Sequence, residues 1–283
     1  MAKMTWEIML AKYERLLKAK EKELYANYKM SYRQLERDFR EIYGNLDEFE
    51  GQLNLDDWSR QLLNYKTGAT MQRLYLSNEK LLKATFNTIF ETTKDNSLKA
   101  IGGTDRLIGI SKAIDRNAII NKSRAGVDWA GRLAHHNANT RYDLINITAG
   151  GIEAGDSYTT ITKKVAEKFL TDYSKAYTIT RTEGHRIYES TKYDTMEEVH
   201  RQLGLEKTWH SVGDERVRHS HQVLDGKTVK FDEEFVSSSG ATALRPGEFG
   251  VASEDINCRC CVSYDYKKDD TNIDNLFFEL EVD

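Results

Sequence analysis

Proline occurs once in this chain of 283 residues, at Pro246. Proteins on average carry proline at about 5% of their positions, and a proline inside a helix removes a hydrogen bond and disrupts the preceding turn. Its near absence permits long uninterrupted helices. Because Pro246 stands late in the chain, we expect the helices early and the loop-rich part near the C-terminus.

Residues 5–43 form the clearest helical pattern. Apolar residues recur there at steps of three, four or seven, which places them on one stripe of a helix: Leu10, Tyr13, Leu17, Leu24, Tyr28, Tyr32, Leu35, Phe39 and Ile42. Such a helix is about 57 Å long, so it must pack against another long helix or project toward a partner. Its mixed charges are typical of a solvated face. The alternative is a DNA-binding face made of Lys18, Lys20, Lys22, Lys29, Arg33, Arg37 and Arg40.

Further amphipathic helices are expected over much of the next 160 residues. We predict helices at 55–66, 69–93 and 105–121, one that ends at Gly150 and Gly151, one through Phe169, and one that ends at Gly204. Residues 1–204 therefore form a helical body, with the long helix 5–43 followed by a helical bundle at 55–204.

The pattern changes near residue 205. Residues 207–212 and 227–231 have the β-branched and aromatic residues of strands, and Asp225–Gly226 is a turn signal between them. A long polar loop follows, and residues 256–266 read as a last strand. We predict an α+β protein, in which a small mixed α/β module at 205–265 follows the helices. An acidic tail at 266–283 ends the chain.

Charge and hydropathy exclude several classes of protein. The net charge of −4 gives no global nucleic-acid signature. No apolar run approaches the ~20 residues needed to span a bilayer, so we expect no membrane partner. The N-terminal residues lack the apolar stretch of a signal peptide, which predicts synthesis in the cytosol.

All three cysteines lie within four positions, at Cys258, Cys260 and Cys261. In a strand, Cys258 and Cys260 would share one face and Cys261 would point to the other. Two thiolates on one face are half of a tetrahedral zinc site. The remaining ligands would come from His221 and His210.

Other roles for these cysteines compete with zinc. As small buried hydrophobic residues they would need no metal, and we expect no cofactor, because the sequence is one ligand short of a convincing zinc site. A cysteine nucleophile with His221 as its base is a further alternative. A disulfide between Cys258 and Cys260 is disfavoured, since their Cα atoms would lie roughly 6–7 Å apart along a strand.

A longer ordered motif surrounds these residues. It comprises Trp209, Asp214, Glu215, Arg216, Arg218, Ser220, His221, Leu224, Asp225, Gly226, Pro246, Gly247, Asn257, Cys258, Arg259 and Cys260, with Arg181, Thr182 and Glu183 upstream. Over about residues 178–262 this pattern resembles the C-terminal module of the phage Mu F-like minor head proteins, the phage head morphogenesis family. His219 departs from the family pattern, which makes it a poor candidate ligand.

The resemblance implies a non-enzymatic minor capsid protein of a tailed bacteriophage. Such a protein would act in head morphogenesis near the portal, with a role in DNA packaging or ejection. Its partners would be portal, head and scaffold proteins, and DNA through the N-terminal helices. It would reside in the virion, in the head interior or near the portal, and in the host cytoplasm during assembly. The alternative function is a metal-dependent nuclease or another phage-encoded enzyme built on the His/Cys module, although no histidine follows the cysteines.

A structural role for the motif follows from its charges. Arg216, Arg218 and Arg259 can pair with Asp214, Glu215 or Asp225 through bidentate hydrogen bonds. Asn257 would tie down the backbone of the loop that contains Pro246, and Asp225–Gly226 would set a turn. We expect the segment 257–260 to act as a clasp that joins the last strand to the segment of His221, because a small module with a thin core needs such a staple.

Overall fold

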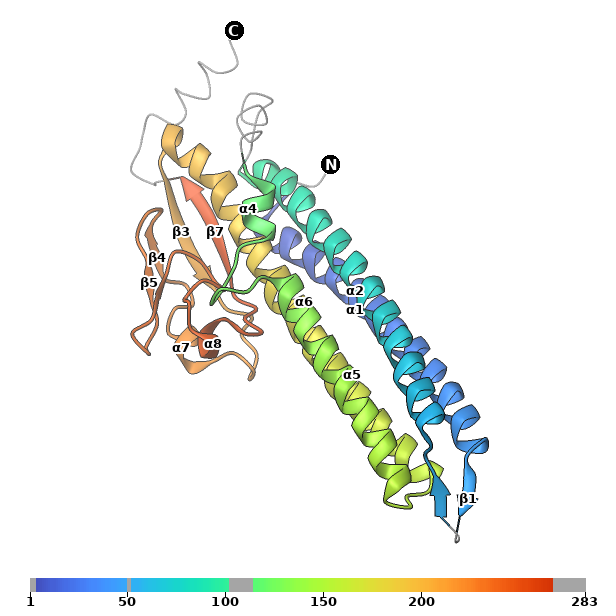
Figure 1. The fold of residues 1–283 in the computed structure, drawn as a ribbon. Helices are drawn as coiled ribbons and strands as arrows, with labels where there is room; N and C mark the ends of the chain where they lie inside the picture. Colours follow the sequence, from blue (N-terminus) through green and yellow to red (C-terminus); the bar gives the residue numbers. More distant parts are fainter. Residues whose placement is uncertain (1–3, 50–51, 102–113, 267–283) are drawn as a thin grey trace. The chain divides into compact units, whose positions relative to one another are not determined.

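The computed structural model describes residues 4–49, 52–101 and 114–266 (Figure 1). Helices dominate the first two thirds of the chain, and short strands are concentrated near the C-terminus, so the predicted α+β class is confirmed. Apart from residue 266, the expected acidic tail lies outside the described residues. Most of the expected helix at 105–121 also lies outside them.

Five helices occupy the described part of the chain before residue 204: α1 (Trp6–Gly44), α2 (Asp57–Ala100), α4 (Arg116–Ile120), α5 (Trp129–Glu153) and α6 (Tyr158–Leu203). The predicted helix 5–43 agrees closely with α1. A short antiparallel hairpin, β1 (Asp47–Phe49) and β2 (Gln52–Asn54), connects α1 to α2. The end of α6 also lies where predicted, because Gly204 has a φ of +67° and its N–H bonds the carbonyl of His200.

Two predicted helix breaks are wrong. The helices expected at 55–66 and 69–93 are one continuous helix, α2, and the helix expected to end at Phe169 continues to Leu203 as α6. The reason at the first break is visible at Gly68. The guanidinium of Arg141 packs against Gly68, and its Nη2 would lie only 2.9 Å from a Cβ atom at this position. Gly68 therefore makes room for Arg141 rather than ending the helix.

The helix end predicted at Gly150 and Gly151 is also wrong. Helix α5 continues to Glu153, and the chain turns at Gly155, whose φ is +75°. A Cβ on Gly151 would lie 2.7 Å from Cγ1 of Ile161, whereas a Cβ on Gly150 would meet nothing within 4 Å. Gly151 thus permits the start of α6 to approach α5 closely.

The C-terminal strands form two small antiparallel sheets (Figure 1). The larger has the order β4-β3-β7, in which β3 pairs with both neighbours. The bounds of these elements are β3 (Leu205–His210), α7 (His219–Gln222), β4 (Thr228–Lys230), β5 (Phe235–Val236), β6 (Thr242–Ala243), α8 (Ala252–Asp255) and β7 (Cys261–Tyr266). The last strand thus begins at Cys261 rather than at 256, and the expected polar loop contains two short strands and a helical turn.

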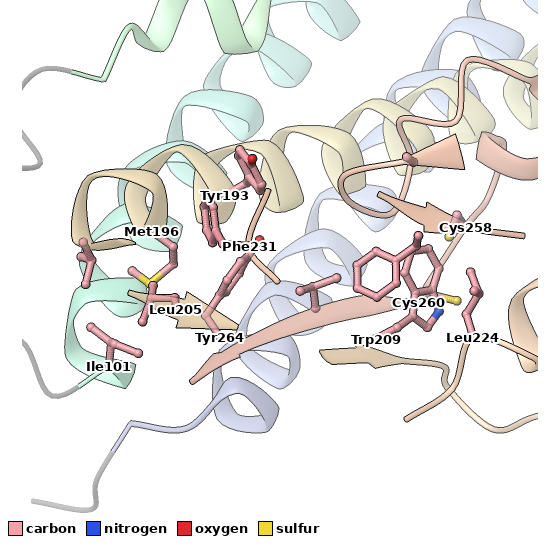
Figure 2. Close-up of a cluster of buried hydrophobic side chains, with 14 of the residues drawn as sticks. Ile101, Tyr193, Met196, Leu205, Trp209, Leu224, Phe231, Cys258, Cys260 and Tyr264 are labelled. Atoms are coloured by element: carbon pink, nitrogen blue, oxygen red, sulfur yellow. The ribbon is translucent and has the colours of Figure 1, made fainter. Parts of the chain in front are cut away.

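The chain packs as two units. Unit 1 comprises Met1–Leu16, Phe86–Lys122 and Thr182–Asp283, and unit 2 comprises Leu17–Thr85 and Ser123–Arg181. This division differs from the boundary expected at residue 204. The helix residues Tyr193 and Met196 belong to the same buried cluster as the strand residues Leu205 and Trp209 (Figure 2), so unit 1 combines helices and sheets in one core.

Unit 2 is a helical unit with polar side chains inside it. The hydroxyls of Tyr28 and Thr140 both donate to the carboxylate of Asp172, at 2.8 and 2.6 Å. The side-chain amides of Asn27 and Asn78 bond each other at 2.9 Å. These bonds satisfy buried polar groups and fix the mutual register of α1, α2, α5 and α6 in this unit. None of the helices in the described ranges is long and apolar enough to cross a membrane.

The contrast between Gly151 and Gly150 predicts opposite effects of the same substitution. Gly151→Ala should destabilise unit 2 by roughly 1 kcal/mol, because overpacking against Ile161 costs about 1–3 kcal/mol and the gain in helix propensity is only about 1 kcal/mol. Gly150→Ala should stabilise it by about 0.5–1 kcal/mol. Urea unfolding followed by circular dichroism measures both, and equal effects of the two substitutions would contradict this account of α5.

Candidate functional site

The site begins at the end of β3, where Trp209 is fully buried. The backbone of Trp209 forms two hydrogen bonds to the segment after α7, one from the N–H of Gly226 and one to the carbonyl of Lys227. The side chain of Asp225 accepts from the N–H of Ser211 at 2.6 Å, and Gly226 has a φ of +73°. Asp225 and Gly226 therefore set a turn, as the sequence pattern predicts, and this turn brings α7 against Trp209.

His221, in α7, lies at the centre of the site with 1% of its surface exposed. Its ring packs edge-on against Trp209 and stacks on Phe249, with centroid distances of 5.4 and 5.3 Å. Its Nε2 lies 2.9 Å from a carboxylate oxygen of Glu254 in α8. Apolar rings thus hold the imidazole in place, and a carboxylate faces one of its two nitrogens.

Glu254 is held in turn by two hydroxyls. Ser220 and Ser239 donate to its two oxygens at 2.8 and 2.6 Å. Burial alone would raise the pKa of Glu254, but these hydrogen bonds and the neighbouring His221 outweigh it and lower the pKa. The carboxylate therefore stays ionised, 2.9 Å from Nε2 of the imidazole, in a contact that lacks hydrogen-bond geometry.

Cys258 and Cys260 meet the other nitrogen of His221. Their sulfur atoms lie 3.6 and 3.5 Å from Nδ1. Both residues precede β7, so the shared face does not come from strand alternation as expected. Asn257, with a φ of +56°, turns the chain just before them. The structure thus brings three of the four predicted ligands together, although for a different geometric reason.

The two buried thiols do not behave alike. The hydrogen bond from Cys260 and the neighbouring histidines lower the pKa of Cys258, and together they outweigh burial, which would raise it. The same hydrogen bond and burial raise the pKa of Cys260. The pair therefore loses its first proton readily and its second with difficulty. Cys261 begins β7, and burial raises the pKa of its thiol to about 12.

The other two candidate histidines lie apart from this cluster. His210 is opposite Cys261 in the β3–β7 register, and its Nε2 lies 2.8 Å from the hydroxyl of Ser263. His219 is exposed at the start of α7. Within the described ranges, the group whose ligand atoms all lie within 4.8 Å of one another contains only His221, Cys258 and Cys260.

Sequence reasoning missed His185, which is 3% exposed in α6. Burial pushes the pKa of His185 down, but the hydrogen-bonding capacity and charge of Cys258 outweigh burial and raise it, so the ring neighbours that sulfur. Its Nε2 is buried with no partner at normal hydrogen-bond geometry. The available signal was its position, two residues after Glu183 in a stretch that already resembled the family motif.

The predicted arginine pairs are formed only in part. Arg259 makes a bidentate pair with Asp214, with Nη1 and Nη2 at 2.7 and 2.6 Å from the two carboxylate oxygens. Arg218 instead donates to the backbone carbonyl of Ile256. Arg216 forms a looser and mostly exposed ion pair, with Nη2 3.6 Å from a carboxylate oxygen of Asp214, and its backbone N–H bonds the same side chain at 3.0 Å. The segment before β7 is therefore clasped to the loop before α7 through Arg259 and Arg218.

A different residue performs the role expected of Asn257. The carboxylate of Asp255 accepts from the N–H groups of Phe249 and Gly250, both at 2.9 Å, and so ties down the loop that contains Pro246. The backbone N–H of Asn257 bonds the hydroxyl of Thr182 at 3.2 Å. A carboxylate can bond two consecutive N–H groups at once, which suits this turn better than a single amide oxygen.

The upstream residues Arg181 and Glu183 belong to different packing units. In unit 2, Arg181 lies 3.1 Å from a carboxylate oxygen of Glu21 in α1. In unit 1, Glu183 accepts from Arg186, whose guanidinium also donates to the carbonyls of Ile119 and Ile120 at the end of α4. This buried arginine network fixes α4 on α6.

The segment that contains the clasp and the ordered motif is similar to a class of phage proteins. The sequence profile described as Phage Mu protein F like protein matches residues 143–263. Minor head protein GP7 of Bacillus phage SPP1 is 34% identical over 128 residues, which cover 44% of this chain and 42% of the relative.

A second relative carries a different name. The NAD(+)–arginine ADP-ribosyltransferase EFV of Enterococcus faecalis (strain ATCC 700802 / V583) is 37% identical over 144 residues, which cover 50% of this chain and 29% of that protein. The chain thus spans less than half the length of either relative. No solved structure matches it significantly.

The pair of Arg259 and Asp214 predicts how stability depends on pH. The hydrogen bonds from Arg259 lower the pKa of Asp214 to about 2, below its ordinary value of about 3.9. Because the folded-state pKa is depressed, the pair contributes stability above about pH 4, and this contribution is lost as the pH falls toward 2. Asp214→Asn should therefore lower stability at pH 6 and flatten its decline between pH 5 and pH 2, as measured by urea unfolding.

The matched control is Glu215→Gln, which neutralises an exposed neighbouring carboxylate. It should leave the pH profile close to that of the unmodified protein. Superimposable profiles of Asp214→Asn and the unmodified protein between pH 5 and pH 2 would show that the pair does not hold the segment.

Proposed function

We propose that this protein is a minor head protein of a tailed bacteriophage that acts in head morphogenesis. The observation that carries the proposal is the ordered motif from Trp209 to Cys260, which lies in the segment that matches the family and is folded here into one clasp. The similarity to the SPP1 minor head protein supports the same role. The protein would reside in the virion and, during assembly, in the host cytoplasm.

We further propose that the role involves no catalytic turnover. His221, Cys258 and Cys260 are buried to within a few per cent of their surface, and neither of the cavities found beside α2 and α5 or beside α1 and α2 is lined by any of them. A nucleophile or general base must reach its substrate, and these groups face one another, Glu254 and the core. The relative named as an ADP-ribosyltransferase is matched over 29% of its length, and release of nicotinamide from NAD⁺ is the activity that tests this alternative.

The portal or another head component is the proposed partner, bound through the helices of unit 2. The most exposed large aromatic side chains in the described part of this unit are Trp58, Tyr65 and Tyr142, with 63, 74 and 68% of their surfaces accessible. Aromatic residues are enriched in protein interfaces and often dominate their binding energy. A solvated helix would more often carry charged or small residues at such positions.

DNA is the weaker candidate partner for the N-terminal helix. Several of its basic side chains already have protein partners: Lys20 pairs with Glu23 at 2.7 Å, and the guanidinium of Arg40 lies 5.8 Å from the centre of the Tyr158 ring. These contacts are typical of a solvated helix surface. Salt-dependent binding of duplex DNA by the intact protein would be the measurement that favours DNA.

Mass spectrometry of purified virions and of heads lacking this gene product tests the proposal. We expect a few copies of the chain per particle, and heads that fail to mature without it. Tyr65→Ser together with Tyr142→Ser should reduce co-purification with the portal about tenfold or more, because an interface hot spot contributes about 2 kcal/mol or more.

The matched control is Val223→Ser together with Val236→Ser, which removes exposed apolar side chains from the strand-containing unit. It should leave co-purification unchanged. Absence of the chain from virions and from assembling heads would overturn the proposed function, as would release of nicotinamide from NAD⁺ or cleavage of plasmid DNA by the purified protein.

A further inference from the structure

The cluster around His221 has the dimensions of a metal site. In a tetrahedral zinc site with Zn–S near 2.3 Å and Zn–N near 2.0 Å, a sulfur and a nitrogen ligand lie about 3.5 Å apart. The Nδ1 of His221 lies 3.6 Å from the sulfur of Cys258 and 3.5 Å from that of Cys260. All three ligand atoms lie within 4.8 Å of one another. One ion can therefore contact all three without rearrangement of the backbone.

The contact with Glu254 prepares His221 to be a ligand. A carboxylate beside Nε2 favours the tautomer that carries its proton there, and this leaves the lone pair of Nδ1 directed toward the sulfurs. Zinc-bound histidines commonly donate their other N–H to a carboxylate in this way. The serines on Glu254 keep that carboxylate ionised and oriented.

His185 is the nearby residue that could become a fourth donor. Its Nε2 is buried without a regular hydrogen-bond partner, which is costly for a polar atom in a protein core unless an unseen group satisfies it. Its ring neighbours Cys258. His185 lies outside the group of three, so its side chain would have to move for a ring nitrogen to reach the ion. A metal ion explains both the orphaned nitrogen and the gathering of two thiols.

We propose that Cys258, Cys260, His221 and His185 form a structural zinc site that joins α6, α7 and the segment before β7. Two sulfur and two nitrogen ligands in a closed buried site suit Zn²⁺ better than the oxygen-preferring Mg²⁺ or Ca²⁺. On binding, the two thiols lose their protons to solvent and become thiolates, and the imidazoles bind as neutral ligands. This site is independent of the proposed role in head assembly.

Metal analysis of the full chain, purified without chelator, tests the proposal. We expect about one zinc per chain, as a closed structural site holds one ion. In protein stripped and reloaded with Co²⁺, we expect intense visible bands of tetrahedral cobalt and a near-ultraviolet band from thiolate coordination. Zinc below about 0.2 per chain that is not restored by added Zn²⁺, or cobalt spectra of octahedral type, would overturn the site.

Single substitutions test the assignment of ligands. Cys258→Ser, Cys260→Ser, His221→Ala and His185→Ala should each weaken zinc binding at least about tenfold, since even loss of a supporting partner costs roughly 10- to 100-fold. Cys261→Ser and His210→Ala are the matched controls, because these residues lie next to the site but outside it, and both should keep one zinc per chain.

The fourth ligand has its own test. Cobalt-loaded His185→Ala should show weaker visible bands than the unmodified protein, since water would replace a nitrogen ligand, while the thiolate band stays. Unchanged affinity and unchanged bands in His185→Ala would overturn the assignment of His185. Loss of zinc in His210→Ala with normal binding in His185→Ala would assign the position to His210 instead. Where a variant fails to fold, the cobalt spectrum of the unmodified protein still decides whether the thiolates bind metal.

Discussion

The buried imidazole of His221 is the point on which the C-terminal part of the structure depends. A carboxylate faces one nitrogen, two sulfur atoms face the other, Phe249 stacks on the ring and Trp209 packs edge-on against it. These partners come from β3, from α8 and the loop before it, and from the segment before β7. Because a buried polar group is costly unless it is satisfied, the arrangement specifies one mutual position of β3, α7, α8 and the chain before β7.

The helices show what periodicity can and cannot predict. Helix α1 was predictable because its apolar stripe is continuous over ten turns and nothing interrupts it. The helix ends were harder, because glycine serves two purposes. Gly204 ends α6 with a left-handed φ, whereas Gly68 and Gly151 lie inside helices where a neighbouring side chain needs the space. Sequence alone does not show that neighbour, so it does not distinguish the two cases.

The site residues that belong to the ordered motif were predictable, and those that lie outside this motif were not. Cys258, Cys260 and His221 were singled out by type and order. Glu254 and His185 were missed, since Glu254 stands in a stretch that reads as a polar loop and His185 occupies an ordinary helical position. Lys207 is a similar case: its place in β3 points it into the core, where its amine bonds the carbonyl of Leu244 at 2.9 Å and burial lowers its pKa to about 8. A charge at such a position is not predictable from alternation.

The pairing of β3 with β7 has a consequence for synthesis. Residues 205–210 bond residues 261–266, and the N–H of Asn257 reaches back 75 positions to Thr182. Contacts so distant in sequence form late, because the ribosome must release the second partner before the first can be covered. A nascent chain that stops short of Cys258 would leave Trp209 and its neighbours open to solvent, a state prone to aggregation and proteolysis. The fold therefore discriminates against truncated copies of the chain.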